Sequence, residues 1–262
     1  MKDDRLTERH VIVTGAAQGI GRGIAQRAAE AGAAVSLFDV NTEAASETKD
    51  SIVDEGGKAQ QIEVDVSDSD AVSAGVEQAI ESFGPVDGLV NNAGIQRSTP
   101  ILELTEDEWD AHMAVNAKGV FFCSREVGAH MVAEGIEGTI VNIASTAAER
   151  PFPGQGVYAA TKSGVVGFTT VLAKELSEHG ITANCINPGT VDTPMVQQWL
   201  KENAERAGIS EDEVLEDALD LHILDQMGQP REIGHVATLL LSDEGSWITG
   251  EVINVDGGYT KM

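Results

Sequence analysis

Tyr158 and Lys162 lie four positions apart in the sequence YAATK, the spacing of residues that share one face of a helix. A free tyrosine ionises near pH 10, so a useful base near neutral pH needs a pKa lowered by about two or three units, or about 3–4 kcal/mol. A nearby ammonium group favours the ionised phenol. Ser145 ends the strand-like run GTIVNIAS, where its hydroxyl can hold a substrate oxygen. Together the three residues predict proton transfer at an alcohol or carbonyl oxygen, although the pair alone also fits two polar residues on an exposed helix face.

A glycine-rich turn, TGAAQGIG, follows the first strand-like run at residues 14–21. Glycines let the backbone approach a pyrophosphate closely, and the N-terminus of the next helix offers free N–H groups and a favourable dipole. The spacing is G-x3-G-x-G and differs from the general G-x-G-x-x-G fingerprint. Its place directly after a strand predicts a dinucleotide site that includes Gly15, Gln18, Gly19, Ile20 and Gly21.

Asp39 ends the second strand-like run, 18 residues beyond Gly21. A carboxylate at this place accepts hydrogen bonds from both ribose hydroxyls of NAD and repels the 2′-phosphate of NADP. Its neighbours Val40, Asn41 and Thr42 offer no cation to that phosphate. The sequence therefore favours NAD as the cofactor, with Asp39 and Val40 in its site.

Short β-branched runs alternate with longer helical stretches along the chain. The runs have continuous apolar centres, which suits a parallel sheet buried on both faces. Repeated β–α alternation predicts an α/β fold with a doubly wound sheet of about seven strands and helices on both faces. The predicted strands are 11–15, 34–40, 59–66, 88–94, 138–145, 181–189 and 251–258. The predicted helices are 20–31, 42–55, 69–82, 106–134, 158–179 and 231–241.

One long insertion, residues 190–228, interrupts this alternation with helical periodicity between two strand-like runs. Long excursions in compact domains are usually lids or binding loops, so we expect a substrate-binding lid here, with a surface ornament as the alternative. No linker-like segment and no repeat divides the rest of the chain. We therefore expect one domain over 1–262.

The chain is strongly acidic, with 43 acidic and 17 basic residues and a net charge of −26. This balance disfavours nucleic acid and anionic membranes as partners. No apolar run has the length of a membrane span, and the charged start MKDDRLTERH lacks the apolar stretch of a signal peptide, so a cytoplasmic location is expected. Two distant cysteines, Cys123 and Cys185, predict neither a disulfide framework nor a metal site. The acidity resembles that of proteins from salt-loving organisms, with an ordinary acidic cytosolic enzyme as the alternative.

Several motifs occur in one order and spacing: TGAAQGIG (14–21), Asp39, Asp65-Val66, Asn91-Asn92-Ala93-Gly94, Asn116, Ser145, Tyr158 with Lys162, and PGTVDT (188–193). In this combination the chain resembles the short-chain dehydrogenase/reductase family over essentially its whole length, and it departs from none of the central motifs. The resemblance implies a Rossmann-type sheet of seven parallel strands, commonly assembled as a homotetramer through two long helices and the C-terminal segment.

The same resemblance implies a role for each matching residue. Tyr158 is the expected general acid/base, Ser145 orients the carbonyl or hydroxyl group, and Lys162 holds the nicotinamide ribose and lowers the tyrosine pKa. Asn116 is expected to distort its helix and to anchor a water in a proton relay. The further cofactor contacts implied are Asp65 and Val66 at the adenine, Asn92, Ala93 and Gly94 at its ribose, and Pro188, Gly189, Val191 and Thr193 at the carboxamide.

The residues expected to face a small-molecule substrate come from loops after the strands and from the insertion. Cations are scarce, so Arg150 is a candidate to clamp a substrate carboxylate bidentately, although a surface pairing with Glu149 or another acid is the alternative. The substrate candidates are Gln96, Arg150, Gln155, Met195 and Trp199, followed by Arg97, Glu149, Phe152, Leu221, His222 and Met227.

We expect the substrate to be a sugar, a sugar acid or a similar polar secondary alcohol, interconverted with its ketone. A 3-oxoacyl (carrier protein) reductase is the first alternative, but the acids in HMVAEGIEGT disfavour docking of an acidic carrier protein. A steroid or cyclic alcohol dehydrogenase stays open because the insertion is rich in apolar residues. A further alternative is a dinucleotide-binding regulator without catalytic activity. Such a protein would not need Asn116, Ser145, Tyr158 and Lys162. All four residues are present, which disfavours this alternative.

Overall fold

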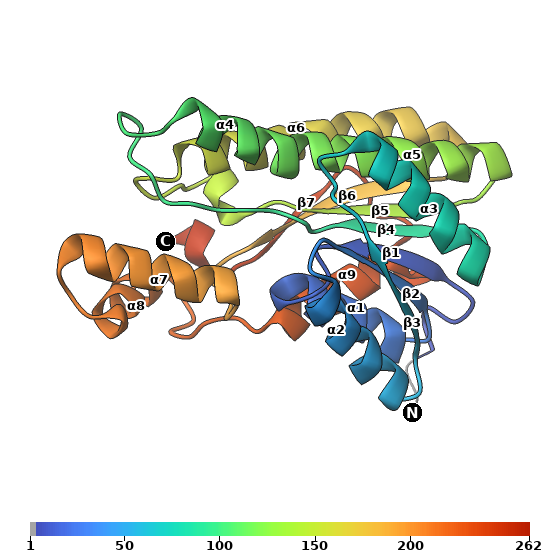
Figure 1. Cartoon of the computed structure of the whole chain (residues 1–262), viewed down its shortest axis with the longest axis horizontal. Helices are drawn as coiled ribbons and strands as arrows, with labels where there is room; N and C mark the ends of the chain where they lie inside the picture. Colours follow the sequence, from blue (N-terminus) through green and yellow to red (C-terminus); the bar gives the residue numbers. More distant parts are fainter. Residues whose placement is uncertain (1–3) are drawn as a thin grey trace.

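Seven parallel strands form one sheet in the order β3-β2-β1-β4-β5-β6-β7 (Figure 1). The computed structural model describes residues 4–262, and the first three residues of the charged N-terminal stretch lie outside the described residues. The predicted doubly wound, Rossmann-type sheet is confirmed, and the direction of winding reverses between β1 and β4. The strands are β1 (His10–Thr14), β2 (Ala34–Asp39), β3 (Lys58–Glu63), β4 (Gly88–Asn91), β5 (Thr139–Ile143), β6 (Thr182–Pro188) and β7 (Val252–Val255).

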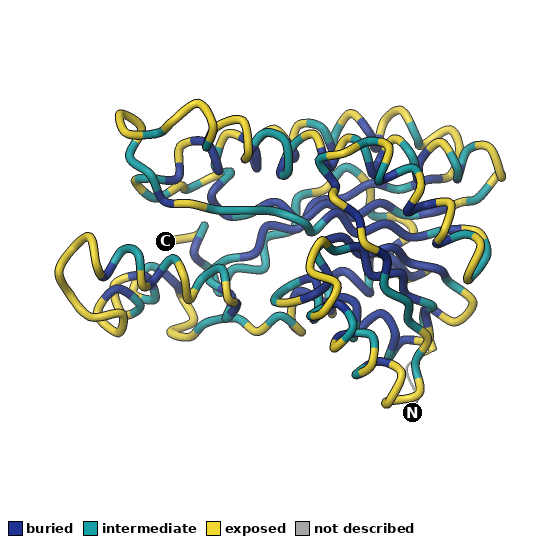
Figure 2. Tube along the Cα trace, viewed as in Figure 1, coloured by how far each residue is buried: buried dark blue, intermediate teal, exposed yellow. Residues whose placement is uncertain are grey.

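Helices cover both faces of the sheet (Figure 1). On β1, Val11 and Val13 face a core shared with α1 and α9, whereas Ile12 faces a core shared with α3, α5 and α6, because successive side chains of a strand point to opposite faces. The sheet is therefore buried on both faces, as its apolar runs predict (Figure 2). The helices are α1 (Gly19–Glu30), α2 (Thr42–Asp54), α3 (Ser69–Phe83), α4 (Glu106–His112), α5 (Gly119–Glu134), α6 (Gly156–Leu176), α7 (Pro194–Ala207), α8 (Glu211–Leu219) and α9 (Pro230–Leu241).

The single helix predicted over 106–134 is wrong in its middle part. A π-helical turn, Met113–Lys118, separates α4 from α5. Side-chain periodicity cannot distinguish this turn from α-helix, because the difference lies in the backbone hydrogen bonds. Several strands are also shorter than predicted, and β3 ends at Glu63, which leaves Asp65 and Val66 in the loop that follows it.

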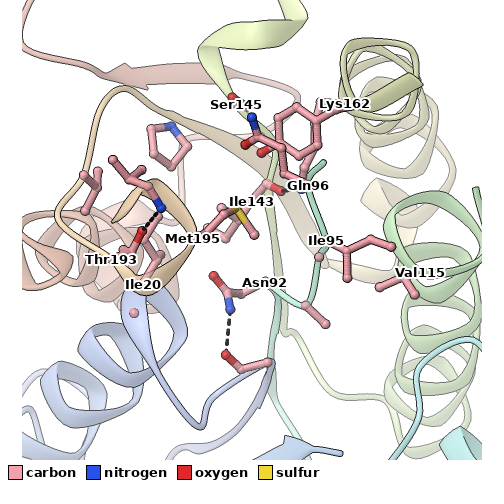
Figure 3. A pocket seen from close by; sticks show the side chains of 18 of the residues that line it. Ile20, Asn92, Ile95, Gln96, Val115, Ile143, Ser145, Lys162, Thr193 and Met195 are labelled. Atoms are coloured by element: carbon pink, nitrogen blue, oxygen red, sulfur yellow. Dashed lines mark hydrogen bonds between the residues drawn. The ribbon is translucent and has the colours of Figure 1, made fainter. Parts of the chain in front are cut away.

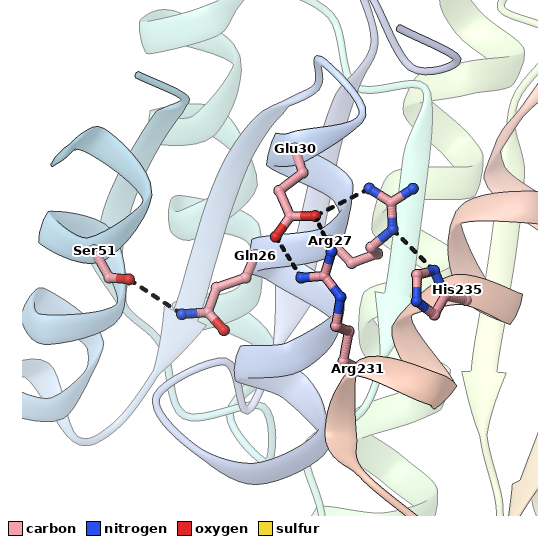
Figure 4. A network of polar contacts seen from close by, with 6 residues as sticks. All are labelled: Gln26, Arg27, Glu30, Ser51, Arg231 and His235. Atoms are coloured by element: carbon pink, nitrogen blue, oxygen red, sulfur yellow. Dashed lines mark hydrogen bonds and ion pairs between the residues drawn. The ribbon is translucent and has the colours of Figure 1, made fainter. Parts of the chain in front are cut away.

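Helices α1 and α9 are joined by an ionic cluster at the C-terminal end of α1 (Figure 4). Arg231 donates to both carboxylate oxygens of Glu30, at 2.5 and 2.6 Å, and Arg27 donates to Glu30 and to Nδ1 of His235. The Arg231 guanidinium, helped by Arg27, holds the pKa of Glu30 below its ordinary value. A bidentate arginine–carboxylate pair is geometrically specific, so the cluster fixes how α1 lies against α9.

The insertion at 190–228 carries α7 and α8 and projects beyond the sheet (Figure 1). It has a small core of its own, formed by Leu200, Ala204 and Val214. Its two ends meet, because Gly228 donates to the carbonyl of Thr190 and accepts from the N–H of Asp192, both at 2.9 Å. Within residues 4–262, no helix combines the length and the apolar character needed to cross a bilayer.

Candidate active site

A cavity of about 450 Å³ lies at the carboxyl ends of the strands, where the winding of the sheet reverses. Ligands of open α/β sheets bind at such a point. The structure brings the predicted catalytic and cofactor-binding residues together there, except that Gly21 and Asn116 do not line the cavity. Figure 3 shows Ile20, Asn92, Gln96, Ser145, Lys162, Thr193 and Met195 around it.

The glycine turn before α1 has little room for side chains. Gly15 and Gly19 have φ values of +63° and +54°, a region that favours glycine. A Cβ on Gly21 would lie 2.1 Å from the carbonyl oxygen of Gly15, and a Cβ on Gly15 would lie 2.7 Å from Cα of Ala93. The Nδ2 atom of Asn92 donates to the Gly15 carbonyl at 2.9 Å. Gly21 therefore acts by packing α1 against the turn.

Asp39 is held at the cavity wall by two backbone groups. Its Oδ2 accepts from the N–H of Ala17 and its Oδ1 from the N–H of Asn41, both at 2.9 Å. Each carboxylate oxygen has a second lone pair, so both can also accept a ribose hydroxyl. At the start of α1, the Gln18 side chain makes no capping bond, which leaves N–H groups available for a phosphate. This half of the cavity fits a dinucleotide.

Ser145, Tyr158 and Lys162 meet at the other end of the cavity. Tyr158 lies in the first turn of α6, and the Ser145 side chain lies close enough to its phenol to favour ionisation. The Nζ atom of Lys162 lies 5.7 Å from the centre of the Tyr158 ring and donates to the Ile143 carbonyl at 2.8 Å. Ser145 also accepts from the N–H of Ala147 at 3.1 Å, which fixes its position after β5.

Burial dominates the protonation of this group. It raises the pKa of Tyr158 above its ordinary value near 10, and the hydrogen bond to Ser145 opposes that rise. Burial also lowers the pKa of Lys162 to about 8. In the protein alone Tyr158 is therefore a protonated donor at neutral pH, and the lowering of its pKa expected from Lys162 is not found. The positive charge of an oxidised nicotinamide would favour the ionised phenol.

Asn116 lies behind the cavity in the π-helical turn and is fully buried. Its Nδ2 donates to the Ile95 carbonyl at 2.9 Å and to Oγ1 of Thr161 at 3.3 Å, and its Oδ1 accepts from the N–H of Ile95 at 2.8 Å. Thr161 donates in turn to the Tyr158 carbonyl. Asn116 thus links the segment after β4 to the first turns of α6.

The substrate end of the cavity has an aromatic wall. Phe152 and Trp199 lie with ring centres 5.8 Å apart, and Met195, Gln96 and Gln155 line the same region. Five of the expected residues do not line the cavity: Arg97, Glu149, Leu221, His222 and Met227. Apolar residues at strand and helix ends also line it without having been singled out, because their side chains carry no chemical signal in the sequence: Ile95, Val115, Ile143 and Ala147.

Arg150 lines the cavity, and one nitrogen of its guanidinium, Nη1, is bound to the C-terminal turn. It donates to the carbonyl of Tyr259 and, at 2.9 Å, to that of Met262, and its Cζ lies 4.8 Å from the centre of the Tyr259 ring. Glu149 instead accepts from Nδ2 of Asn187. The pairing of Arg150 with Glu149 is therefore absent, and Nη1 of Arg150 instead finds its acceptors in the C-terminal turn, which returns to this loop.

Comparisons with known proteins identify the family to which this chain belongs. A family model described as "Enoyl-(Acyl carrier protein) reductase" matches residues 15–260. The chain is also similar to the "Short-chain reductase protein NovJ" of Streptomyces niveus, with 41% identity over 251 residues that cover 96% of this chain and 94% of the relative. The chain belongs to the short-chain dehydrogenase/reductase family.

Other short-chain dehydrogenases/reductases resemble it over nearly their whole length. The 3-oxoacyl-[acyl-carrier-protein] reductase FabG of Thermotoga maritima is 38% identical, covering 97% of this chain and 98% of the relative. A 2,5-dichloro-2,5-cyclohexadiene-1,4-diol dehydrogenase of Sphingobium indicum is 35% identical, covering 98% and 99%. The crystal structure of levodione reductase superposes with a TM-score of 0.93 at 35% identity, covering 98% and 99%. The chain is therefore an oxidoreductase of this family.

Proposed function

We propose that this short-chain dehydrogenase/reductase interconverts a secondary alcohol and its ketone with NAD as the cofactor. The observation that carries the proposal is the meeting of Ser145, Tyr158 and Lys162 in the cavity that the glycine turn and Asp39 also line. A dinucleotide-binding protein without turnover would not require that grouping.

The glycine turn and the start of α1 would hold the diphosphate, and Asp39 the adenine ribose. Asp65 and Val66 would contact the adenine, Asn92, Ala93 and Gly94 its ribose, and Lys162 the nicotinamide ribose. A bound nicotinamide supplies or accepts the hydride, and the protein supplies position and charge. The segment that would hold the carboxamide is Pro188, Gly189, Val191 and Thr193.

In the direction of reduction, the Tyr158 hydroxyl donates its proton to the substrate carbonyl oxygen. The Ser145 hydroxyl donates a hydrogen bond to the same oxygen and holds it in reach. The charged Lys162 stabilises the phenolate that remains. Oxidation runs through the same groups in reverse, with Tyr158 as the base.

We expect NADH to bind at least about tenfold more tightly than NADPH, because Asp39 repels a 2′-phosphate and no cationic side chain follows β2 in the cavity lining. Fluorescence titration of the two reduced cofactors measures both Kd values without a substrate. Asp39→Ser should bring the Kd values for NADH and NADPH close to each other. Asp54→Asn removes one exposed charge at the end of α2 and should leave the ratio intact. Equal Kd values in the wild type would contradict the proposed preference for NAD.

We also propose that the charge of −26 is an adaptation to concentrated salt. Screening between separated surface carboxylates is essentially complete by about 1 M salt, where the Debye length is about 3 Å. An adapted surface should therefore continue to gain thermal stability between about 1 M and 2 M KCl, beyond what screening explains. Thermal unfolding at a series of KCl concentrations checks this, and a plateau above about 1 M would reject it.

The names of the relatives cover acyl, cyclic diol and dione chemistry and do not single out a substrate. The sugar or similar polar alcohol expected from the sequence is one member of the secondary-alcohol class proposed here. The substrate end of the cavity narrows that class further.

A further inference from the structure

Arg150 brings to the cavity a positive charge that the proposed reaction does not use. Four ionisable residues that are charged near neutral pH line the cavity among those described: Asp39, Asp65, Arg150 and Lys162. The two aspartates follow β2 and β3, in the half that fits the adenosine. Lys162 is 3% exposed and, in the proposed reaction, stabilises the phenolate of Tyr158. Arg150 is therefore the cation left for a second group of the substrate.

The guanidinium of Arg150 is held in place and keeps one edge free. Its Nη1 donates to the main-chain oxygens of Tyr259 and Met262, and its Cζ lies 4.8 Å from the centre of the Tyr259 ring. The Tyr259 hydroxyl donates in turn to the Arg150 carbonyl at 2.8 Å. Nε and Nη2 make no hydrogen bond to a described residue. These two nitrogens lie on one edge of the planar group, and such an edge can bind both oxygens of a carboxylate in parallel.

No acidic side chain of residues 4–262 forms an ion pair with this arginine. The neighbouring Glu149 does not line the cavity and accepts from Nδ2 of Asn187. Arg150 is half-buried, so its guanidinium has lost part of its hydration. Neither Nε nor Nη2 is among the fully buried polar atoms that lack a partner, so both remain accessible to a ligand. An anion at this edge would restore charge-assisted hydrogen bonds to the guanidinium.

Arg150 follows closely on the group that carries out proton transfer. Its N–H donates to the Thr146 carbonyl at 2.8 Å, at the end of the short turn that begins at Ser145. Phe152 of the aromatic wall lies two residues further and contacts the Tyr259 ring on which Arg150 is stacked, with 5.7 Å between ring centres. The reacting end, the aromatic wall and the free guanidinium edge therefore belong to one loop of the same cavity. The carbon atoms of a substrate can lie against such a wall.

We propose that the substrate is a hydroxy acid, or the corresponding oxo acid, whose carboxylate binds to Nε and Nη2 of Arg150. Its reacting oxygen lies at Ser145 and Tyr158, and the carbon atoms between the two groups lie against Phe152. This rests on the proposed oxidoreductase function of the same cavity. It makes Arg150 a specificity-determining residue, and it excludes neutral ketones and alcohols as preferred substrates.

Matched pairs of ketones test the charge requirement. The acids are acetoacetate, levulinate and a cyclohexanone with a carboxylate on the ring carbon opposite the carbonyl. Each is compared with its primary amide, which has nearly the same size and shape but no charge. The acids differ in the separation between carboxylate and carbonyl, and so cover different distances from Arg150 to the reacting oxygen. We expect kcat/KM with NADH to be at least about tenfold higher for the acid than for the amide in at least one pair.

Variants connect this preference to Arg150. Arg150→Gln should lower kcat/KM for the preferred acid by at least about tenfold and change that for its amide by less than about threefold, whereas mere loss of the contacts to the C-terminal turn would affect both compounds alike. Arg150→Lys should recover part of the preference, because it restores the charge without the fork. Arg9→Gln is the matched control, because Arg9 lies just before β1, pairs with Asp243 and does not line the cavity. Thermal unfolding of each NADH complex with and without the acid reports folding and binding independently of turnover.

The outcomes separate the two proposals. If the wild type uses every amide at least as well as its acid, the substrate class is overturned and the oxidoreductase function stands. An Arg150→Gln variant that folds and keeps the preference for the acid would also overturn the proposal, because the carboxylate would then bind elsewhere. If no acid and no amide is reduced although NADH binds, the proposed function itself fails.

Discussion

Tyr158→Phe should lower kcat by about three orders of magnitude, within the range that a general acid or base contributes. Phenylalanine keeps the buried ring and removes only the hydroxyl that meets Ser145. The Kd for NADH should remain within about twofold of the wild-type value, because the loss falls on proton transfer. Single-turnover kinetics and a fluorescence titration measure the two quantities separately.

The second tyrosine of the chain provides the control. Tyr259→Phe removes a hydroxyl that donates to the Arg150 carbonyl behind the aromatic wall. One hydrogen bond of this kind contributes about 1 kcal/mol, so KM should rise a few-fold at most and kcat should stay close to wild type. If Tyr158→Phe retained a kcat within about tenfold of wild type, another group would have to move the proton.

Gly21→Ala should weaken NADH binding by about a hundredfold or more and lower the free energy of unfolding by about 1–3 kcal/mol. The added methyl would lie 2.1 Å from the Gly15 carbonyl oxygen and 2.5 Å from Nδ2 of Asn92, so α1 must move away from the turn. The ionic cluster around Glu30 and the contacts with α9 resist that movement. Isothermal titration with NADH and chemical denaturation measure the two effects.

Gly128→Ala is the corresponding control in a helix interior. Its added methyl would meet Cδ1 of Leu176 at 3.6 Å and Cδ1 of Ile140 at 3.9 Å, which are ordinary contacts. Alanine is the better helix former by about 1 kcal/mol, so this variant should be at least as stable as the wild type and bind NADH normally. Normal NADH affinity in Gly21→Ala would show that the turn tolerates a shift of α1.

Most of the sheet could be predicted from the sequence because its inner strands are buried on both faces and leave largely apolar runs: β1, β2, β4, β5 and β6. The ends of the strands could not, since the polar residues that follow belong to the ligand-binding edge. Asp65 is an example: the sequence places it inside a strand over 59–66, whereas β3 ends at Glu63 and Asp65 turns back to accept from Ser67. Local pattern does not separate the last strand residue from the first loop residue.

The substrate end of the cavity could not be predicted from the sequence, because it is formed by contacts between residues that lie far apart in the chain. Arg150 binds carbonyls of Tyr259 and Met262, more than a hundred positions away, and nothing near Arg150 in the sequence indicates them. Likewise the wall of Phe152 and Trp199 joins a loop before α6 to the insertion. The proton-transfer group could be predicted from the sequence, because Tyr158 and Lys162 lie one helical turn apart and their residue types are chemically distinctive.

The insertion leaves the sheet and returns to it at one point, where Gly228 is bonded to Thr190 and Asp192. Thr193 is packed against the glycine turn, since a Cβ on Gly19 would lie 3.2 Å from its Cγ2. The stretch from 194 to 227 is therefore closed at its base, and it also contacts the C-terminal turn through His222 and Leu224. We expect an exchange of this stretch to change which compound is accepted, while the residues that move the proton, which lie outside it, keep their places.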